Sequence, residues 1–120
     1  MKSYRDLEIY KMAYRLAVEV HKLSLTLPKY ELYEQGGQVR RSSKGVKDAI
    51  VEGYGRRRYK QDFIKFLVYA QSSCDETIDH LKMISEIHFP DSPLTHLNKE
   101  YNILGKKINK YIQYVESNWK

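Results

Sequence analysis

The sequence predicts an all-α fold, an antiparallel up-and-down four-helix bundle that forms a single domain over residues 1–120. Apolar residues recur at spacings of three and four along most of the chain, which is the periodicity of amphipathic helices. Alternation of apolar and polar residues, which would indicate strands, is sustained nowhere. Prolines and glycines interrupt the periodic chain and divide it into four segments with short connections.

The first helix is predicted over residues 4–25. Its apolar side chains recur every three or four residues, so they share one face. Pro28 follows this segment, and a proline cannot continue a helix because it lacks the backbone N–H group. The face predicted to be buried carries Leu7, Tyr10, Tyr14, Ala17 and Val20, and Ile9, Met12, Leu16 and Leu23 widen it.

The second helix is predicted over residues 31–53. Gly36 and Gly37 each cost a helix roughly 1 kcal/mol relative to alanine. Two alternatives are open: they permit close approach of another helix, or the helix begins after Gly37. The segment "GYG" at 53–55 is predicted to end the helix because glycine readily adopts left-handed conformations. The buried line is predicted to comprise Leu32, Gly36, Val39, Ser43, Val46, Ile50 and Gly53.

The third helix is predicted over residues 59–88 and has the most regular apolar line of the chain. This line comprises Phe63, Leu67, Ala70, Cys74, Ile78, Leu81 and Ile84. In the segment "FPDSPL" that follows, Ser92 is predicted to be the N-cap of the fourth helix and Pro93 its first helical residue. The apolar line of the fourth helix comprises Leu94, Leu97, Tyr101, Leu104, Ile108, Tyr111 and Val115.

Composition indicates a cytoplasmic protein without a membrane segment. No apolar run approaches the roughly 20 residues that a membrane-spanning helix needs. The N-terminal "MKSYRDLEIYK" lacks the continuous apolar segment of a signal peptide. The single cysteine, Cys74, cannot form an internal disulfide, which favours a reducing compartment. Because Cys74 lies on the apolar line of the third helix, we predict that it is a core residue.

The sequence contains no catalytic or metal-binding constellation. The four histidines include no pair four residues apart, and there is no Glu-x-x-His motif, so neither a helical zinc pair nor a di-iron centre is predicted. Asp75, Glu76 and Asp79 are interpreted as a solvated helix face. We therefore expect no enzymatic activity, no catalytic residue, no metal, no cofactor and no small-molecule substrate.

Positive charge is concentrated in one quarter of the chain. The net charge is +6, and residues 36–65 hold this whole excess, with nine basic and three acidic residues. Such an asymmetry indicates contact with a polyanion such as nucleic acid. The residues predicted to bind nucleic acid are Arg40, Arg41, Lys44, Lys47, Arg56, Arg57, Arg58 and Lys60.

The chain has eleven tyrosines, more than the core of a small bundle needs. Tyrosine has a large apolar body and a polar tip, so it suits subunit interfaces, and its ring also stacks on unpaired bases. Both uses remain open for the tyrosines with charged neighbours. These are Tyr54, Tyr59, Tyr69, Tyr111 and Tyr114.

A series of motifs makes the chain resemble a known family. The segments "YRDLEIYKMAYRLAVEV", "LPKYELY", "QVRR", "VEGYGRR" and "FIKFLVYAQSSCDETIDHL" resemble the four-helix-bundle family encoded in 23S rRNA intervening sequences, often labelled S23 ribosomal protein. The resemblance covers about residues 4–90, and the fourth helix is similar only in character. The matching positions are Asp6, Leu7, Tyr10, Pro28, Gln38, Arg40, Arg41, Glu52, Gly53, Ser73 and Glu76.

The chain also departs from the family pattern. Lys47 and Ala49 stand where the family commonly has proline and asparagine, and Tyr10 stands where tryptophan is more usual. The resemblance implies a non-enzymatic bacterial bundle that assembles with itself into a ring, a homopentamer. It also implies a link to RNA.

Two functions remain open at this point. The first is an accessory protein that binds RNA or DNA through its basic residues. The second is an oligomeric scaffold that binds a protein partner, in which Arg41 pairs with Glu52 or Glu76 inside the bundle. The exposure of Arg40 and Arg41 distinguishes them, because phosphate-binding arginines must face solvent and network arginines need a carboxylate within reach.

Overall fold

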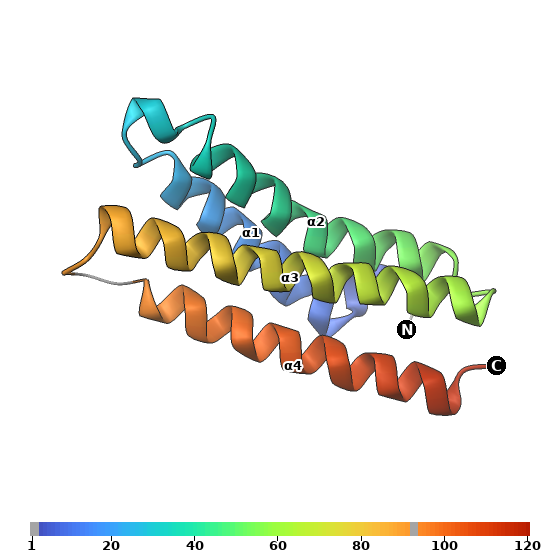
Figure 1. The fold of residues 1–120 in the computed structure, drawn as a ribbon. Helices are drawn as coiled ribbons and strands as arrows, with labels where there is room; N and C mark the ends of the chain where they lie inside the picture. Colours follow the sequence, from blue (N-terminus) through green and yellow to red (C-terminus); the bar gives the residue numbers. More distant parts are fainter. Residues whose placement is uncertain (1–2, 92–93) are drawn as a thin grey trace.

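The computed structural model describes residues 3–91 and 94–120 and confirms the all-α prediction. Four helices pack as an antiparallel bundle that measures 48 × 22 × 20 Å (Figure 1). They are α1 (Glu8–Ser24), α2 (Gln35–Gly55), α3 (Lys60–His88) and α4 (Thr95–Asn118), with short 3-10 helices η1 (Tyr4–Asp6) and η2 (Lys29–Glu31) before α1 and α2. The most extensive helix–helix contact is between α2 and α3. Helix α4 packs mainly against α3 and makes a smaller contact with α1.

The N-terminal segment is not one continuous helix, so the predicted start at residue 4 was wrong. Ser3 caps η1 with a capping box: its hydroxyl accepts from the Arg5 N–H at 3.0 Å, and the Asp6 carboxylate accepts from the Ser3 N–H at 3.2 Å. Leu7 then adopts an extended conformation and buries its side chain, so α1 begins only at Glu8.

The buried face of α1 agrees with most of the predicted face. Ile9, Leu16, Ala17 and Val20 are buried as predicted, and Ala13 is buried beside them. Tyr14 was predicted to be buried, but it is 50% exposed because it lies on the flank of that face. This correction places an aromatic ring on the surface between α1 and α2.

The helix α2 ends at Gly55, within the "GYG" segment predicted to end it and two residues after Gly53. No described residue has a positive φ, so the left-handed conformation predicted there was wrong. A methyl group added at Gly53 would lie 3.0 Å from Cβ of Phe66 and 3.3 Å from the carbonyl oxygen of Phe63. Gly53 therefore lets the backbones of α2 and α3 approach each other.

The start of α2 settles the alternatives for Gly36 and Gly37. Both lie inside α2, which begins at Gln35. Close approach is the correct alternative, but the neighbour of Gly36 is the backbone of η2 rather than another helix. A methyl group there would lie 3.0 Å from the carbonyl oxygen of Glu31.

The cores of α3 and α4 follow the predicted lines closely. On α3, the line from Phe63 to Ile84 is buried apart from the half-buried Ile78. On α4, the buried residues are Tyr101, Leu104, Ile108, Ile112 and Val115. The predicted cap Ser92 and the predicted first helical residue Pro93 lie outside the described residues.

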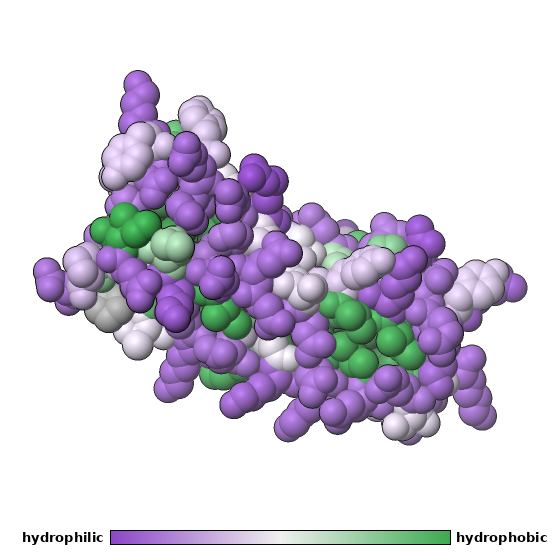
Figure 2. All heavy atoms as spheres, in the orientation of Figure 1, coloured by the Kyte–Doolittle hydropathy of each residue, from purple (hydrophilic) through white to green (hydrophobic). Residues whose placement is uncertain are grey.

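The surface is largely hydrophilic, with local apolar patches. On the face shown in Figure 2, hydrophilic side chains cover most of the molecule, and apolar side chains are exposed over α3 and between α3 and α4. The exposed apolar residues of α3 include Val68, Met83 and Ile87. None of the helices in the described part of the chain has a stretch long and apolar enough to span a bilayer.

Candidate nucleic-acid interface

The eight predicted basic residues do not form one surface. Arg40 and Arg41 lie near the start of α2, whereas Arg56, Arg57 and Arg58 follow its end. At about 1.5 Å per residue, Arg41 and Arg56 are about 22 Å apart along the helix axis. The structure therefore divides the predicted set into separate places, which have different surroundings.

Arg40 is an internal structural residue. Its guanidinium donates to the Ser24 hydroxyl at 2.9 Å and to the Leu32 carbonyl oxygen at 2.7 Å. These bonds join the end of α1 and the segment before α2 to α2 itself. Neither predicted alternative fits Arg40, because its half-buried guanidinium is bonded to a hydroxyl and a carbonyl oxygen rather than being free in solvent or paired with a carboxylate.

Arg41 faces solvent, at a hollow between α2 and α3. The hollow is lined by Gln38, Arg41, Ser42, Ser73, Glu76 and His80. The ion pairs among the described residues include none to Arg41, and Glu52 pairs instead with Arg56. The internal pairing of Arg41 with Glu52 or Glu76, which the scaffold alternative offered, is therefore not formed.

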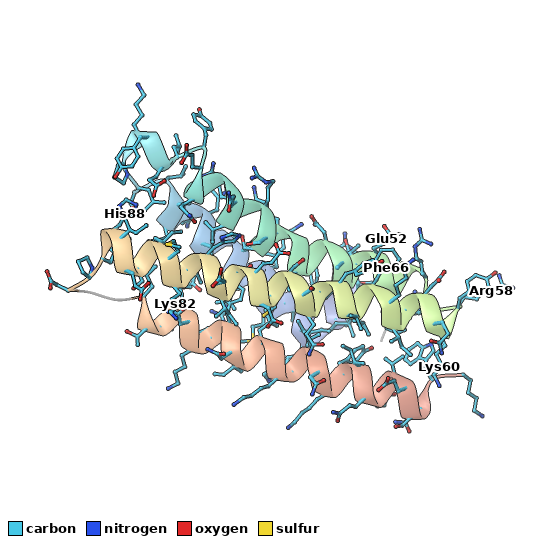
Figure 3. All side chains as sticks on the ribbon, in the orientation of Figure 1. Glu52, Arg58, Lys60, Phe66, Lys82 and His88 are labelled. Carbon is cyan, nitrogen blue, oxygen red and sulfur yellow. The ribbon has the colours of Figure 1, made fainter. Side chains whose placement is uncertain are left out.

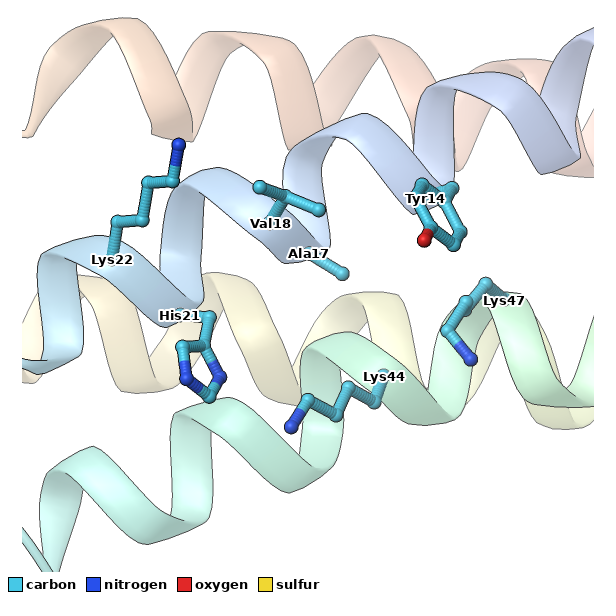
Figure 4. A pocket seen from close by; sticks show the side chains of 7 residues that line it. All are labelled: Tyr14, Ala17, Val18, His21, Lys22, Lys44 and Lys47. Atoms are coloured by element: carbon cyan, nitrogen blue, oxygen red, sulfur yellow. The ribbon is translucent and has the colours of Figure 1, made fainter.

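Lys44 and Lys47 lie beside a groove between α1 and α2 (Figure 4). Its floor is apolar, formed by Ala17, Val18 and the ring of Tyr14. Lys44 is exposed, and Lys47 is half-buried and pairs with Asp48. The groove thus combines an apolar floor with a cationic rim.

The connection between α2 and α3 is a basic surface turn, formed by Arg56, Arg57 and Arg58; we name it the arginine turn. All three residues are exposed. Arg56 pairs with Glu52 at 2.7 Å and with Asp62 at 3.8 Å, and its guanidinium lies 5.0 Å from the centre of the Phe66 ring. The positive charge of Arg56 is therefore largely compensated.

Arg57 and Arg58 keep uncompensated charge. The Arg57 guanidinium lies 4.1 Å from the centre of the Tyr54 ring and donates to the Tyr54 carbonyl oxygen at 2.8 Å. Arg58 lies at the end of the molecule (Figure 3), 5.9 Å from the centre of the Tyr59 ring. Neither has a carboxylate partner among the described residues, so both are available to an anion.

Lys60 binds the end of α4. Its Nζ donates to the carbonyl oxygen of Glu116 at 2.7 Å, in the last turn of that helix, where a cation is favoured. Trp119 is tied to the same corner, since its indole N–H donates to the Arg57 carbonyl oxygen at 2.9 Å. These two bonds hold the arginine turn against the C-terminal end of the chain.

The candidate tyrosines near the arginine turn are partly core residues. Tyr54 is only 6% exposed, so its predicted availability for contact was wrong. Tyr111 is half-buried, and burial, with smaller contributions from Tyr54 and Tyr114, raises its pKa to about 12 although the nearby Arg57 opposes this rise. Tyr59 and Tyr114 are exposed, at 63% and 50%, and remain accessible rings beside the arginines.

Sequence reasoning missed a line of tyrosines on α1. The ring centres of Tyr4 and Tyr10 are 4.9 Å apart, and those of Tyr10 and Tyr14 are 5.9 Å apart. Arg5 and Lys11 line the same surface hollow as these rings. The spacing of four between Tyr10 and Tyr14, with basic neighbours, was the available signal, but it also fitted a core stripe.

The other polar candidates do not form a reactive site. Cys74 is fully buried, as predicted, and burial with the nearby charge of Asp75 raises the pKa of its thiol to about 12. Asp75, Glu76 and Asp79 are exposed on α3. Within residues 3–91 and 94–120, no three His, Cys, Asp or Glu side chains are grouped so that they could hold a metal ion.

The fold and these surfaces define a helical-bundle protein with a basic turn and separate basic grooves. The family of 23S rRNA-intervening sequence proteins matches residues 5–110, and the chain belongs to this family. The match reaches into α4, further than the sequence resemblance over residues 4–90. No curated protein matches the chain.

Proposed function

We propose that the protein is a non-catalytic, oligomeric accessory protein of the cytoplasm that binds RNA or DNA. The arginine turn is the observation that carries this proposal. It presents two arginines with uncompensated charge at the end of the bundle, next to the exposed ring of Tyr59. Arginine binds phosphate well because its planar guanidinium donates two parallel hydrogen bonds.

The chemical groups and the shape of the arginine turn determine how it can contact nucleic acid. Phosphate contacts position a protein on nucleic acid but carry no sequence information. The arginine turn is a short connection between two packed helices, so it cannot enter a major groove as a recognition helix does. We therefore infer binding through backbone and shape, with a strong dependence on salt.

Self-assembly would strengthen such binding. The family resemblance implies a ring, and we propose a homo-oligomer, a pentamer, in which each subunit presents its own arginine turn. Several weak contacts on one assembly add through a high effective concentration. The exposed Val68, Met83 and Ile87 on α3 offer apolar area for subunit contacts.

These apolar residues also favour a second candidate function, a scaffold that binds a protein partner. The two functions are distinguished by titrating the purified protein with structured RNA and with duplex DNA across a salt series, while light scattering reports its mass. The proposal predicts binding at about 150 mM salt, with a linear fall of log affinity against log salt. Loss of binding at that salt, while the oligomer stays intact, would favour the scaffold.

A further inference from the structure

The line of tyrosines on α1 leads into the groove between α1 and α2. Tyr4, Tyr10 and Tyr14 contact one another in sequence, and Tyr4 and Tyr10 also pack against the core. Tyr14 stands at the exposed end of this line and belongs both to the hollow beside Tyr4 and to the groove. The two hollows therefore adjoin at Tyr14, and we name them together the tyrosine track.

The ring of Tyr14 is held in place before any ligand binds. Tyr10 packs against it with ring planes tilted by 44°, and Tyr4 packs edge-on against Tyr10 at 79°. Since this support comes from core-packed rings, Tyr14 loses little conformational freedom when its exposed side is covered. The apolar side chains of Ala17 and Val18 continue the surface beside it.

Positive charges lie at the start of the track and along its α2 side. The Arg5 guanidinium lies 4.8 Å from the centre of the Tyr4 ring, at the start of the track. Lys44 and Lys47 border the groove from α2, opposite Tyr14 and His21 (Figure 4). Asp48 pairs with Lys47, whereas none of the ion pairs among the described residues involves Lys44 or Arg5.

An unpaired nucleic-acid strand fits this combination of groups. Proteins that bind single strands combine aromatic rings, on which bases stack, with a positive groove that follows the phosphates. In a duplex the base faces are already stacked, so an apolar floor and a tyrosine ring have nothing to contact there. From Tyr10 to His21 the track runs about 16 Å along α1.

We propose that the tyrosine track binds a single-stranded segment of RNA or DNA, with a base on Tyr14 and phosphates on Lys44 and Arg5. This inference rests on the proposed nucleic-acid function and adds the class of ligand. It also separates two tasks, because the arginine turn offers charge to any phosphate backbone whereas the track requires exposed bases.

The test compares single strands with a duplex at one salt concentration, about 150 mM. Fluorescently labelled oligouridine and oligothymidine of about 12 nucleotides and an RNA duplex of equal length are titrated with protein, and binding is followed by anisotropy. Tyr14→Ala is expected to weaken single-strand binding by about five- to one-hundredfold, because it removes one stacking contact. Its affinity for the duplex should stay within twofold of wild type.

Two control variants show whether any effect depends on the aromatic ring of Tyr14 in particular. Tyr14→Phe keeps the ring and should bind oligouridine as wild type does. Tyr30→Ala removes another exposed tyrosine ring, from η2, which lines neither hollow of the track, and should have no effect. Because Tyr14 is half exposed, its alanine variant should keep the helical content and melting temperature of wild type within a few degrees.

The outcomes separate this inference from the function on which it rests. If single strands and duplex bind but Tyr14→Ala binds oligouridine as wild type does, the track is wrong and the proposed function stands. If neither nucleic acid binds, both are wrong. If Tyr14→Ala lowers the mass of the oligomer and leaves binding unchanged, the groove is a contact between copies of the chain, which overturns the inference. A preference between oligouridine and oligothymidine identifies which strand the track accepts.

Discussion

Arg40 and Arg41 are neighbours in the sequence, but their guanidinium groups have different surroundings. Successive residues of a helix point about 100° apart, so Arg40 faces the α1 side, where it donates to Ser24 and to the Leu32 carbonyl oxygen. Arg41 points out beside the hollow between α2 and α3. A basic residue on a helix therefore contributes to a binding surface only if no neighbouring element takes its hydrogen-bond donors.

A second residue-scale feature is the buried hydrogen bond between His88 and Glu31. Nε2 of His88 lies 2.8 Å from the Glu31 carboxylate, and the two side chains are only 9% and 8% exposed. The pair joins the end of α3 to η2. A buried carboxylate that loses its partner is strongly destabilising, because nothing repays the loss of its hydration.

His88→Ala should therefore lower the free energy of unfolding by about 3 kcal/mol. Urea denaturation followed by circular dichroism measures this change. Lys82→Ala on the same helix is the matched control, since Lys82 is exposed and should change stability by less than about 0.5 kcal/mol (Figure 3). Equal stability of the two variants would show that the buried pair does not tie η2 to α3.

The thiol of Cys74 should not react while the protein is folded. Burial, with the charge of Asp75, raises its pKa to about 12, and the nucleophile is the thiolate. At pH 8 the folded protein therefore holds far less thiolate than the unfolded chain, whose cysteine ionises near its usual pKa. Alkylation by iodoacetamide should follow the unfolding transition in urea. Rapid alkylation without denaturant would contradict the burial of Cys74.

At the scale of elements, small residues of α2 decide how closely α3 approaches. Gly53 faces the α3 backbone, whereas a methyl group at Gly55 would meet nothing within 4 Å. Both glycines are helical and neither has a positive φ. They therefore share the same backbone penalty and differ only in packing.

This difference predicts opposite effects for two alanine substitutions. Gly55→Ala should raise the free energy of unfolding by about 0.5 to 1 kcal/mol, because alanine loses less backbone entropy. Gly53→Ala should lower it by about 1 kcal/mol or more, since overpacking against Phe63 and Phe66 outweighs the propensity gain. Thermal unfolding of the pair measures both. Stabilisation by both substitutions would mean that α2 and α3 can separate without cost.

The apolar periodicity predicted the helices correctly where the tertiary packing agrees with the local helix preference of the sequence. The predicted third helix began one residue before α3, and its apolar line is largely buried. Prediction failed at Leu7 and missed the close helix contact at Gly53, because an extended turn and a helix contact depend on neighbours that lie far away in the sequence. A local pattern does not contain that information.

The candidate site was predictable only in part. A run of three arginines next to a helix end indicated the exposed turn, and the structure agrees. The groove of the tyrosine track joins α1 to α2, so its members meet only when the bundle forms. Tyr14 was placed in the core for this reason: its spacing fits the apolar stripe, and the position of α2 decides which flank stays open.

At the scale of the whole molecule, basic and aromatic side chains gather at one end of the bundle. The arginine turn and the C-terminal segment lie together there (Figure 1). At this end, Lys60 donates a hydrogen bond to the Glu116 carbonyl oxygen, and Trp119 donates one to the Arg57 carbonyl oxygen. These hydrogen bonds hold the segment that carries Arg57 and Arg58 against the C-terminal end of the bundle.

The most direct test of the central claim is the salt dependence of nucleic-acid binding by an Arg57→Ala, Arg58→Ala double variant. Arg56 is left in place because it pairs with Glu52 and Asp62. If the two arginines bind phosphates, the slope of log affinity against log salt should become shallower by about 2 relative to wild type. Lys82→Ala should leave the slope unchanged. A double variant with the wild-type slope and affinity would contradict the assignment of the arginine turn as the nucleic-acid contact.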